Sequence, residues 1–403
     1  MRLIFGFFMF SISFVISAQY AGGIGGSGDV DKLFDTRLEG TRFISSSGTN
    51  WNVDTSWNTG IVPSEAQYVI IDAEATVEID HHLRIAGIEV LEGAEVVVAA
   101  DNALQITDLF VNRGTITLKA DSLGGYALLK FDGELDFAGT GSVVQQQFFK
   151  GGWHMVSSSM KTTSPSFFGK VNGSRHPNAM NFFSWDGRDF ALVDSVGSAI
   201  QKGLGYYGYV GKFSGQVVGF QDIGLKSFQG IPNANADFPQ LTPSSTMANA
   251  NVAISGDPLI RGGWSMLGNP FTSVLDFQSL DLNGVEDAFY IFDPSVGDEG
   301  EFFSWSEGGI ENPHIAPLQA FWVRSAINNP SISSVNMKDN AIIPATNPNF
   351  FRAGNSFDRV VLRSAEVANP NYKDHTVIAL IENTTDGFDN GWDARKMMPS
   401  ENT

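Results

Sequence analysis

The residues best suited to chemistry in this sequence are three aspartates in one acidic turn near its end. Asp386, Asp389 and Asp393 lie in the segment Asp-Gly-Phe-Asp-Asn-Gly-Trp-Asp. Ca²⁺ prefers several oxygen ligands from a flexible loop, and aspartates beside glycine can supply them. The spacing is not that of an EF-hand, and a solvated turn is the alternative interpretation. If the turn binds an ion, we expect a structural calcium site, and we expect no other cofactor.

Three tryptophans are the candidates for contact with a ligand. Trp185, Trp305 and Trp392 lie close to glycine or acidic residues, in segments expected to be loops. An exposed indole ring offers a flat apolar face on which a sugar ring can stack. The pattern therefore makes these three the predicted glycan-binding residues. Trp153 and Trp264 recur at equivalent places within predicted strands and are expected to pack in the core.

The sequence lacks the motifs that carry common hydrolytic chemistry. It contains neither a Gly-x-Ser-x-Gly nucleophile elbow nor a His-Glu-x-x-His zinc motif. His81 and His82 are the only adjacent histidines, and neighbours on a strand point to opposite faces. We interpret this pair as the end of a strand that meets solvent. The prediction is that the chain is not an enzyme.

Short apolar runs recur at regular intervals between residues 45 and 148. Within each run apolar and polar residues alternate with period two, and glycine, asparagine or aspartate separates the runs. This pattern predicts a small parallel β-helix, in which each coil stacks its apolar residues on the next. A flat β-sandwich would give similar alternation and is the alternative. Trp51 and Trp57 are expected to cap the open end of the stack.

A sequence repeat follows this region. The two copies match at three places in the same order: Gly151–Val156 with Gly262–Leu267, Phe182–Asp186 with Phe289–Asp293, and Leu204–Tyr207 with Leu318–Phe321. Three matches in one order indicate a duplicated module. Because each match is a short aromatic strand, the fold class predicted for the chain is all-β. It would be a short β-helix-like domain followed by β-sandwich-like repeats.

The sequence divides into six predicted segments. They are a signal peptide (1–18), a flexible leader (19–44), a β-helix-like domain (45–148), two β repeat modules (149–255 and 256–340) and a partial third β module (341–403). Arg2 precedes an apolar run that ends at Ser17-Ala18, which is the pattern of a secretory signal peptide. The third module contains too few strand-like runs to close a pair of sheets, so we expect it to be truncated.

Charge and composition exclude several classes of partner. Lys and Arg total 25 against 44 Asp and Glu, a formal net charge of −19. Nucleic acid and anionic membranes select for basic patches, so neither is expected as a partner. Beyond the signal peptide no apolar run approaches the length of a membrane span. The absence of cysteine excludes disulfides and thiolate metal sites.

Several segments carry a family resemblance. The segment from Trp51 to Ile79 forms one such match, and Gly263–Phe271 with Ile315–Val323 forms another. The first resembles the β-helix-like segment near the N-terminus of secreted multidomain surface proteins of Bacteroidetes, which leave the cell by type IX secretion. The second resembles their GWNLLGNP…IxPGQGFFV pattern. The first repeat departs from it, with Ser157–Ser159 in place of Gly-Asn-Pro, and the C-terminal sorting domain of the family is missing.

The resemblance implies export to the cell surface or the medium, with the secretion machinery as a partner. It does not imply catalysis. We therefore predict a binding or structural, adhesin-like protein, with polysaccharide or a cell-surface glycan as the expected ligand. The alternative is a non-catalytic accessory region of a larger secreted carbohydrate-active enzyme.

Overall fold

The computed structural model describes the parts of the chain that form its sheets. The described residues are 41–45, 49–150, 152–161, 171–173, 176–179, 182–193, 200–210, 224–234, 236–246, 262–293, 301–306, 313–326, 333–344, 359–365, 373–379 and 385. The predicted signal peptide and nearly all of the leader lie outside them. Of the described residues, 54% are in strands and 4% in helices, which confirms the all-β prediction.

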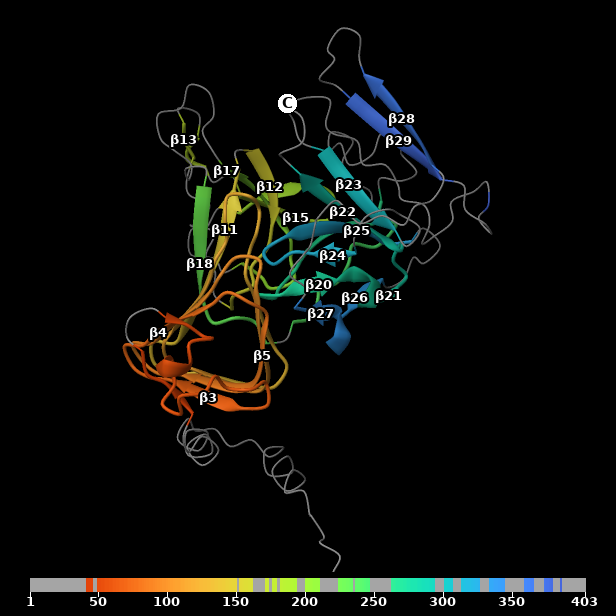
Figure 1. Cartoon of the computed structure of the whole chain (residues 1–403). Helices are drawn as coiled ribbons and strands as arrows, with labels where there is room; N and C mark the ends of the chain where they lie inside the picture. The colour runs from red at the N-terminus through yellow and green to blue at the C-terminus, as the bar shows by residue number, and fades with distance from the viewer. Residues whose placement is uncertain are drawn as a thin grey trace, which may run out of the picture. The chain divides into compact units, whose positions relative to one another are not determined.

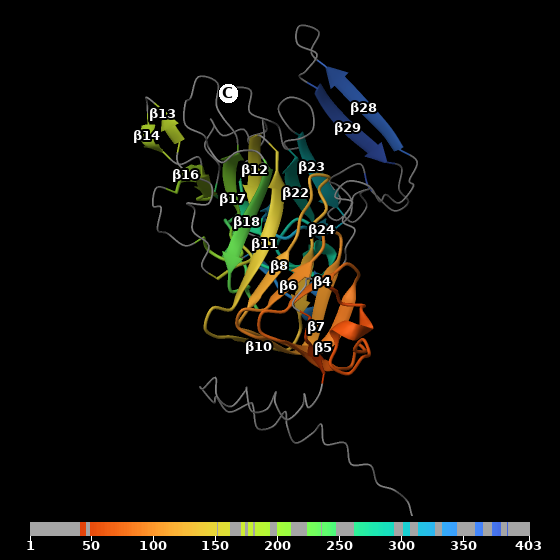
Figure 2. The same cartoon turned by 60° about the vertical axis from the view of Figure 1, so that its left-hand side comes forward.

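Residues 42–149 form a parallel β-solenoid of about three turns. One of its two sheets contains β1 (Arg42–Phe43), β3 (Tyr68–Ile71), β5 (Leu83–Val90), β7 (Ala103–Asn112), β9 (Leu128–Phe131) and β10 (Glu134–Phe137). The other contains β2 (Thr49–Asn50), β4 (Thr76–Ile79), β6 (Glu95–Val98), β8 (Thr115–Leu118) and β11 (Ser142–Phe149). Figure 2 shows β4, β6, β8 and β11 side by side. The chain alternates between the two sheets, so the coil prediction is confirmed and the flat sandwich is not.

Apolar residues in register fill the interior of the solenoid. Val77 pairs with Val96, Val96 with Ile116, and Ile116 with Val143, and all four are fully buried. Burying an aliphatic side chain of this size stabilises the fold by about 1.5–3 kcal/mol. Because each coil repeats the same apolar positions, the period-two pattern of the sequence becomes a continuous column in the core.

The two copies of the sequence repeat form two four-stranded antiparallel sheets with the same strand order. The first sheet is β12 (Gly152–Val156), β17 (Tyr206–Val210), β15 (Phe182–Trp185) and β16 (Phe190–Leu192). The second is β19 (Trp264–Gly268), β25 (Ala320–Arg324), β22 (Ala288–Asp293) and β23 (Glu301–Ser306). Each matched pair of sequence segments occupies the same place in its sheet. The duplication seen in the sequence is therefore a duplication of topology.

The two repeat sheets pack against each other through an aromatic layer. Trp185 of β15 and Trp322 of β25 meet edge to face, with ring centroids 5.2 Å apart. Met155 and Trp264 belong to the same buried cluster. The two copies therefore share this buried cluster and form a single sandwich.

The solenoid continues directly into the repeats. β18 (Gly224–Gly230), from the range predicted as the first repeat module, pairs antiparallel with β11 and extends the solenoid sheet. The Thr272 hydroxyl donates to the carbonyl of Leu129 at 2.7 Å, and the Leu129 amide donates to the Thr272 carbonyl at 3.0 Å. These contacts attach the second repeat to β9 of the solenoid. Figure 1 shows the solenoid coils in orange and the second repeat sheet in teal.

The remaining described elements are small. They are the strands β13 (Val171–Gly173), β14 (His176–Ala179), β20 (Val274–Asp276), β21 (Asp281–Asn283), β24 (His314–Ile315), β26 (Ser334–Asn336), β27 (Ile342–Ile343), β28 (Arg359–Ala365) and β29 (Lys373–Ala379), and the 3-10 helices η1 (Asp54–Ser56), η4 (Phe277–Ser279) and η5 (Asp339–Ala341). β28 and β29 pair as an antiparallel hairpin within the range predicted as the third module. No helix in the described part of the chain is long and apolar enough to cross a membrane.

Asn269 of the Gly-Asn-Pro motif holds the bend after β19. Its side-chain amide is fully buried and donates to the carbonyls of Ser273, Ile315 and Ala316 at 2.9–3.0 Å. Its side-chain oxygen accepts from the amide of Phe271. One asparagine thus satisfies four backbone groups that the bend removes from regular sheet pairing. The motif has a structural role at this position.

Candidate functional site

A cluster of polar side chains lies at one corner of the solenoid, near its N-terminal end. It consists of Asn50, Asn52, Asp80 and His81, and we call it the polar corner. β4 ends at Ile79 and β5 begins at Leu83, both with buried side chains, so Asp80 and His81 lie in the turn between the two sheets. Asn50 ends β2, and Asn52 lies in the corresponding turn after that strand.

Buried aromatic residues fix the orientation of the two asparagines. Trp51 and Trp57 are 1% and 2% exposed, and their rings meet edge to face at 4.7 Å. The Trp57 indole N–H donates to the Trp51 carbonyl at 2.9 Å. Because Trp51 is anchored in the core, its neighbours Asn50 and Asn52 are only partly buried or exposed. Both tryptophans pack in the solenoid core, and their role as a cap on the end of the stack stays a prediction.

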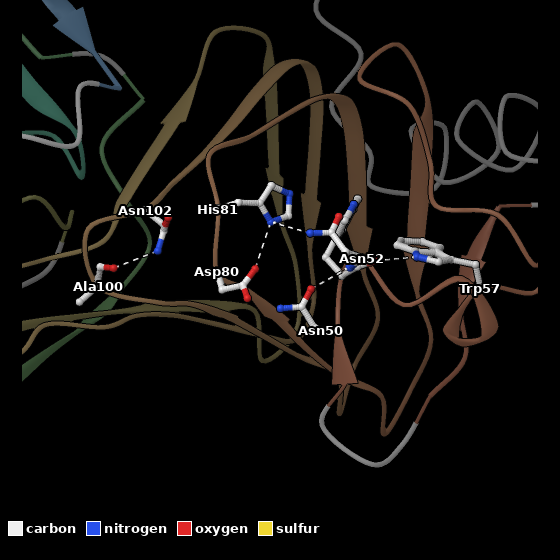
Figure 3. Close-up of polar contacts among 8 residues, drawn as sticks. Asn50, Asn52, Trp57, Asp80, His81, Ala100 and Asn102 are labelled. Carbon is white, nitrogen blue, oxygen red and sulfur yellow. Dashed lines mark hydrogen bonds and ion pairs between the residues drawn. The ribbon is translucent and has the colours of Figure 1, made fainter.

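Hydrogen bonds link the four residues of the polar corner in an open chain (Figure 3). The Asn52 backbone N–H donates to Asn50 Oδ1 at 2.9 Å. His81 Nδ1 lies 3.3 Å from Asp80 Oδ1 and 3.2 Å from Asn52 Nδ2. His81 therefore lies between the side chains of Asp80 and Asn52, while the corner stays open to solvent.

Hydrogen bonds from Asn50 and then His81 lower the pKa of Asp80 below its usual value. Asp80 is therefore ionised at neutral pH, and its charge favours a proton on His81 Nδ1. In that tautomer Nδ1 donates to Asp80 Oδ1. The second ring nitrogen points away from both partners (Figure 3) and is then a hydrogen-bond acceptor.

The polar corner has the composition of a hydrogen-bonding surface. The side chains of Asp80 and His81 are 54% and 33% exposed, so part of each side chain reaches solvent. The corner carries one carboxylate. Within the part of the chain that the structure describes, no group of three His, Cys, Asp or Glu side chains is arranged to hold a metal ion.

The structure places two predicted ligand-binding tryptophans in the interior. Trp185 ends β15 and is 7% exposed, and Trp305 lies in β23 and is 4% exposed. Trp305 stacks on Phe289 with centroids 5.7 Å apart. The expectation that both lie in exposed loops is wrong, because each ring is needed to fill the core beside a repeat sheet. Neither offers a free face to a sugar.

The other predicted site residues cannot be placed. Trp392 and the three aspartates of the acidic turn, Asp386, Asp389 and Asp393, lie outside the described residues. The glycan and calcium predictions for these positions therefore remain predictions.

Trp153 and Trp264 differ in burial although they occupy matching places in the repeat. Trp264 is fully buried, as expected, whereas Trp153 is only half-buried. Trp153 stacks in parallel on Tyr207, with ring centroids 5.0 Å apart. Burial raises the pKa of Tyr207, so this phenol stays neutral across the physiological range. The aromatic packing of the first repeat sheet therefore extends to its edge strand, β12.

Sequence reasoning did not identify the polar corner. It correctly placed His81 and His82 at a strand end that meets solvent. It did not connect His81 with Asn52, which is 29 positions away. One signal could have identified the site. Asn, Asp and His recur between successive apolar runs, and aligning the sequence with itself at the length of one coil would place these residues side by side.

The fold defines the chain as an all-β protein that joins a short parallel solenoid to an antiparallel sandwich. Residues 43–288 match a family described as a domain of unknown function (DUF8693), and the chain belongs to that family. The match begins in β1 and ends at the start of β22, so it spans the solenoid and the whole first repeat. No curated protein and no solved structure matches the chain.

Proposed function

We propose that this chain is a secreted cell-surface protein with a binding or structural, adhesin-like role and without catalytic activity. The observation that carries the proposal is the aromatic sandwich. The repeated aromatic strands pack the two copies together, as Trp185 on Trp322 illustrates. Repeats used in this way build a rigid support. The solenoid joined to that support displays the polar corner to solvent.

Export is supported by the sequence of the first eighteen residues and by the resemblance to type IX secretion substrates. The acidic charge of −19 also suits a protein that stays clear of anionic membranes and nucleic acid. Display on the surface requires that the folded chain reach the outside of the cell with its solenoid accessible.

Surface display is tested by expressing the full chain, fused at its C-terminus to a type IX sorting domain, in a Bacteroidetes host with active type IX secretion. Intact cells are labelled with an antibody and treated with protease. We expect surface labelling that protease removes, and its loss when residues 1–18 are deleted. Full-length protein found only after lysis, protected from protease in intact cells, would refute the proposal.

The second candidate is a non-catalytic accessory region of a larger secreted carbohydrate-active enzyme. The polar corner favours it, because an accessory module needs exposed hydrogen-bonding groups on a rigid fold. Sequencing the complete reading frame separates the two candidates. A catalytic domain in the same polypeptide supports the accessory role, and further β repeats with a sorting domain support the adhesin-like role.

A further inference from the structure

We propose that the polar corner binds the hydroxyl groups of a neutral glycan. This inference rests on the binding role proposed above and assigns it to Asn50, Asn52, Asp80 and His81. It also moves the predicted glycan contact away from Trp185 and Trp305, whose rings are buried.

The chemistry of the four side chains matches that of a sugar. Each hydroxyl of a sugar is both a donor and an acceptor, and neighbouring hydroxyls present both at once. A carboxylate accepts through two oxygens, and a primary amide both donates and accepts. At the polar corner the exposed Asp80 carboxylate and Asn52 amide lie on either side of His81 Nδ1, at 3.3 Å and 3.2 Å. Adjacent hydroxyls can therefore be contacted by adjacent side chains.

These hydrogen bonds prepare the side chains for binding. The Asn50 side chain accepts from the Asn52 backbone N–H, and His81 Nδ1 contacts the side chains of both Asp80 and Asn52. Rotation of any of these side chains breaks a contact. Fixing a side chain on binding costs conformational entropy, and preorganisation removes part of that cost. The buried ring of Trp51 holds the backbone between the two asparagines.

The next coil extends the same surface. Ile79 is in register with Val98, and Leu83 with Leu104, so residues 99–102 form the turn that follows the Asp80–His81 turn. Asn102 lies in that turn and donates to the Ala100 carbonyl at 2.9 Å (Figure 3). Successive strands lie about 4.8 Å apart. A glycan of more than one residue can therefore run along the corner from one coil to the next.

Charge argues for a neutral ligand. Asp80 lies in the corner and the exposed Asp101 lies in the turn of the next coil, and both repel a phosphate, sulfate or uronate. In the described part of the chain no group of three His, Cys, Asp or Glu side chains is arranged to hold a metal ion. The groups present are those that recognise uncharged hydroxyls.

The test uses the full mature chain on an array of oligosaccharides. The array carries neutral hexose and N-acetylhexosamine oligomers beside sialylated and sulfated ones, and the best neutral ligand is titrated by calorimetry. We expect binding to neutral oligomers that EDTA does not remove. Asp80→Ala and Asn52→Ala should each weaken binding about tenfold, as expected for loss of a hydrogen bond to a charged or well-oriented group.

A matched control is Glu92→Ala, which removes an exposed carboxylate from another turn of the solenoid. It should leave affinity unchanged, and all three variants should keep the far-UV circular dichroism spectrum of the parent. Equal affinity of Asp80→Ala and the parent would overturn the inference, as would binding confined to anionic glycans or dependent on a divalent ion. Absence of any glycan binding would overturn it too. None of these results affects the surface-display experiment, which tests the proposed function separately.

Discussion

The indole N–H of Trp185 donates to the backbone carbonyl of Trp264 at 2.8 Å, joining the two copies of the repeat. Trp185 ends β15 of the first sheet, and Trp264 begins β19 of the second. The bond is buried, and both rings belong to the aromatic layer between the sheets. A hydrogen bond inside an apolar layer fixes the position of one sheet on the other, because sliding would leave a donor and an acceptor unsatisfied.

Replacing Trp185 should therefore loosen the sandwich. Trp185→Phe keeps an aromatic ring but removes the donor and part of the volume, and we expect a loss of about 2–3 kcal/mol in the free energy of unfolding. Urea denaturation followed by intrinsic fluorescence measures it. Leu192→Ala, on an exposed residue of the neighbouring strand β16, is the control and should change stability by less than about 0.5 kcal/mol. Equal effects of the two substitutions would contradict this account.

Asn269 should be among the residues least tolerant of substitution. Asn269→Ala leaves three buried carbonyls and the Phe271 amide without their side-chain partner, and we expect a loss of about 3 kcal/mol or more in unfolding free energy. Asn269→Asp should cost more, because a carboxylate would face the same carbonyl oxygens. Thermal denaturation of both variants checks the order. Asn102→Ala is the control, because the Asn102 side chain donates to one carbonyl, that of Ala100. If Asn269→Ala were as stable as Asn102→Ala, the structural role of Asn269 would be refuted.

Glu74 adopts a backbone conformation that favours glycine. Its φ is +63°, and Gly93 occupies the same place in the next coil with φ +85°. Glu74 is exposed, so substitution removes no core packing. Relief of left-handed strain is worth about 1–2 kcal/mol, and the greater chain entropy of glycine offsets about 0.5–1 kcal/mol of it. Glu74→Gly should therefore raise stability by up to about 1 kcal/mol, and Gly93→Ala should lower it. Chemical denaturation of the pair tests the prediction, and a destabilised Glu74→Gly would refute it.

The sequence predicted the solenoid because its signal is local. Val77 and Val96 occupy equivalent positions in successive coils. The alternation visible in the sequence therefore identifies the same residues that fill the core. The burial of Trp185 was not predictable in this way. Its partner Trp264 lies 79 positions away in the other copy, and the repeat does not reveal that the copies face each other. The polar corner was not predicted for a similar reason. Asn52 and His81 meet only because one coil of the solenoid separates them, and the sequence does not state the length of that coil.

His314 should make stability depend on pH. It lies opposite Asp276 in the pairing of β24 with β20, and burial lowers its pKa, with Asp276 opposing part of that effect. The unfolded chain therefore binds a proton at a pH where the folded chain does not. Stability from this residue is fully present above the unfolded pKa of 6.5 and is lost as the pH falls through the folded pKa.

Two measurements test the role of His314. The free energy of unfolding should decline from about pH 7 to about pH 5 in the parent, and His314→Gln should reduce the slope in that window. Leu192→Ala, which removes an exposed side chain without a titratable group, is the control and should leave the slope as it is. Asp276→Asn in the parent background should steepen the decline. Asp276 also accepts a hydrogen bond from the backbone amide of Gln278 at the start of η4, and asparagine keeps a side-chain oxygen for that bond. Removing the carboxylate takes away the group that raises the pKa of His314, so the folded pKa falls further from that of the unfolded chain. A slope unchanged by His314→Gln would show that other groups set the pH dependence.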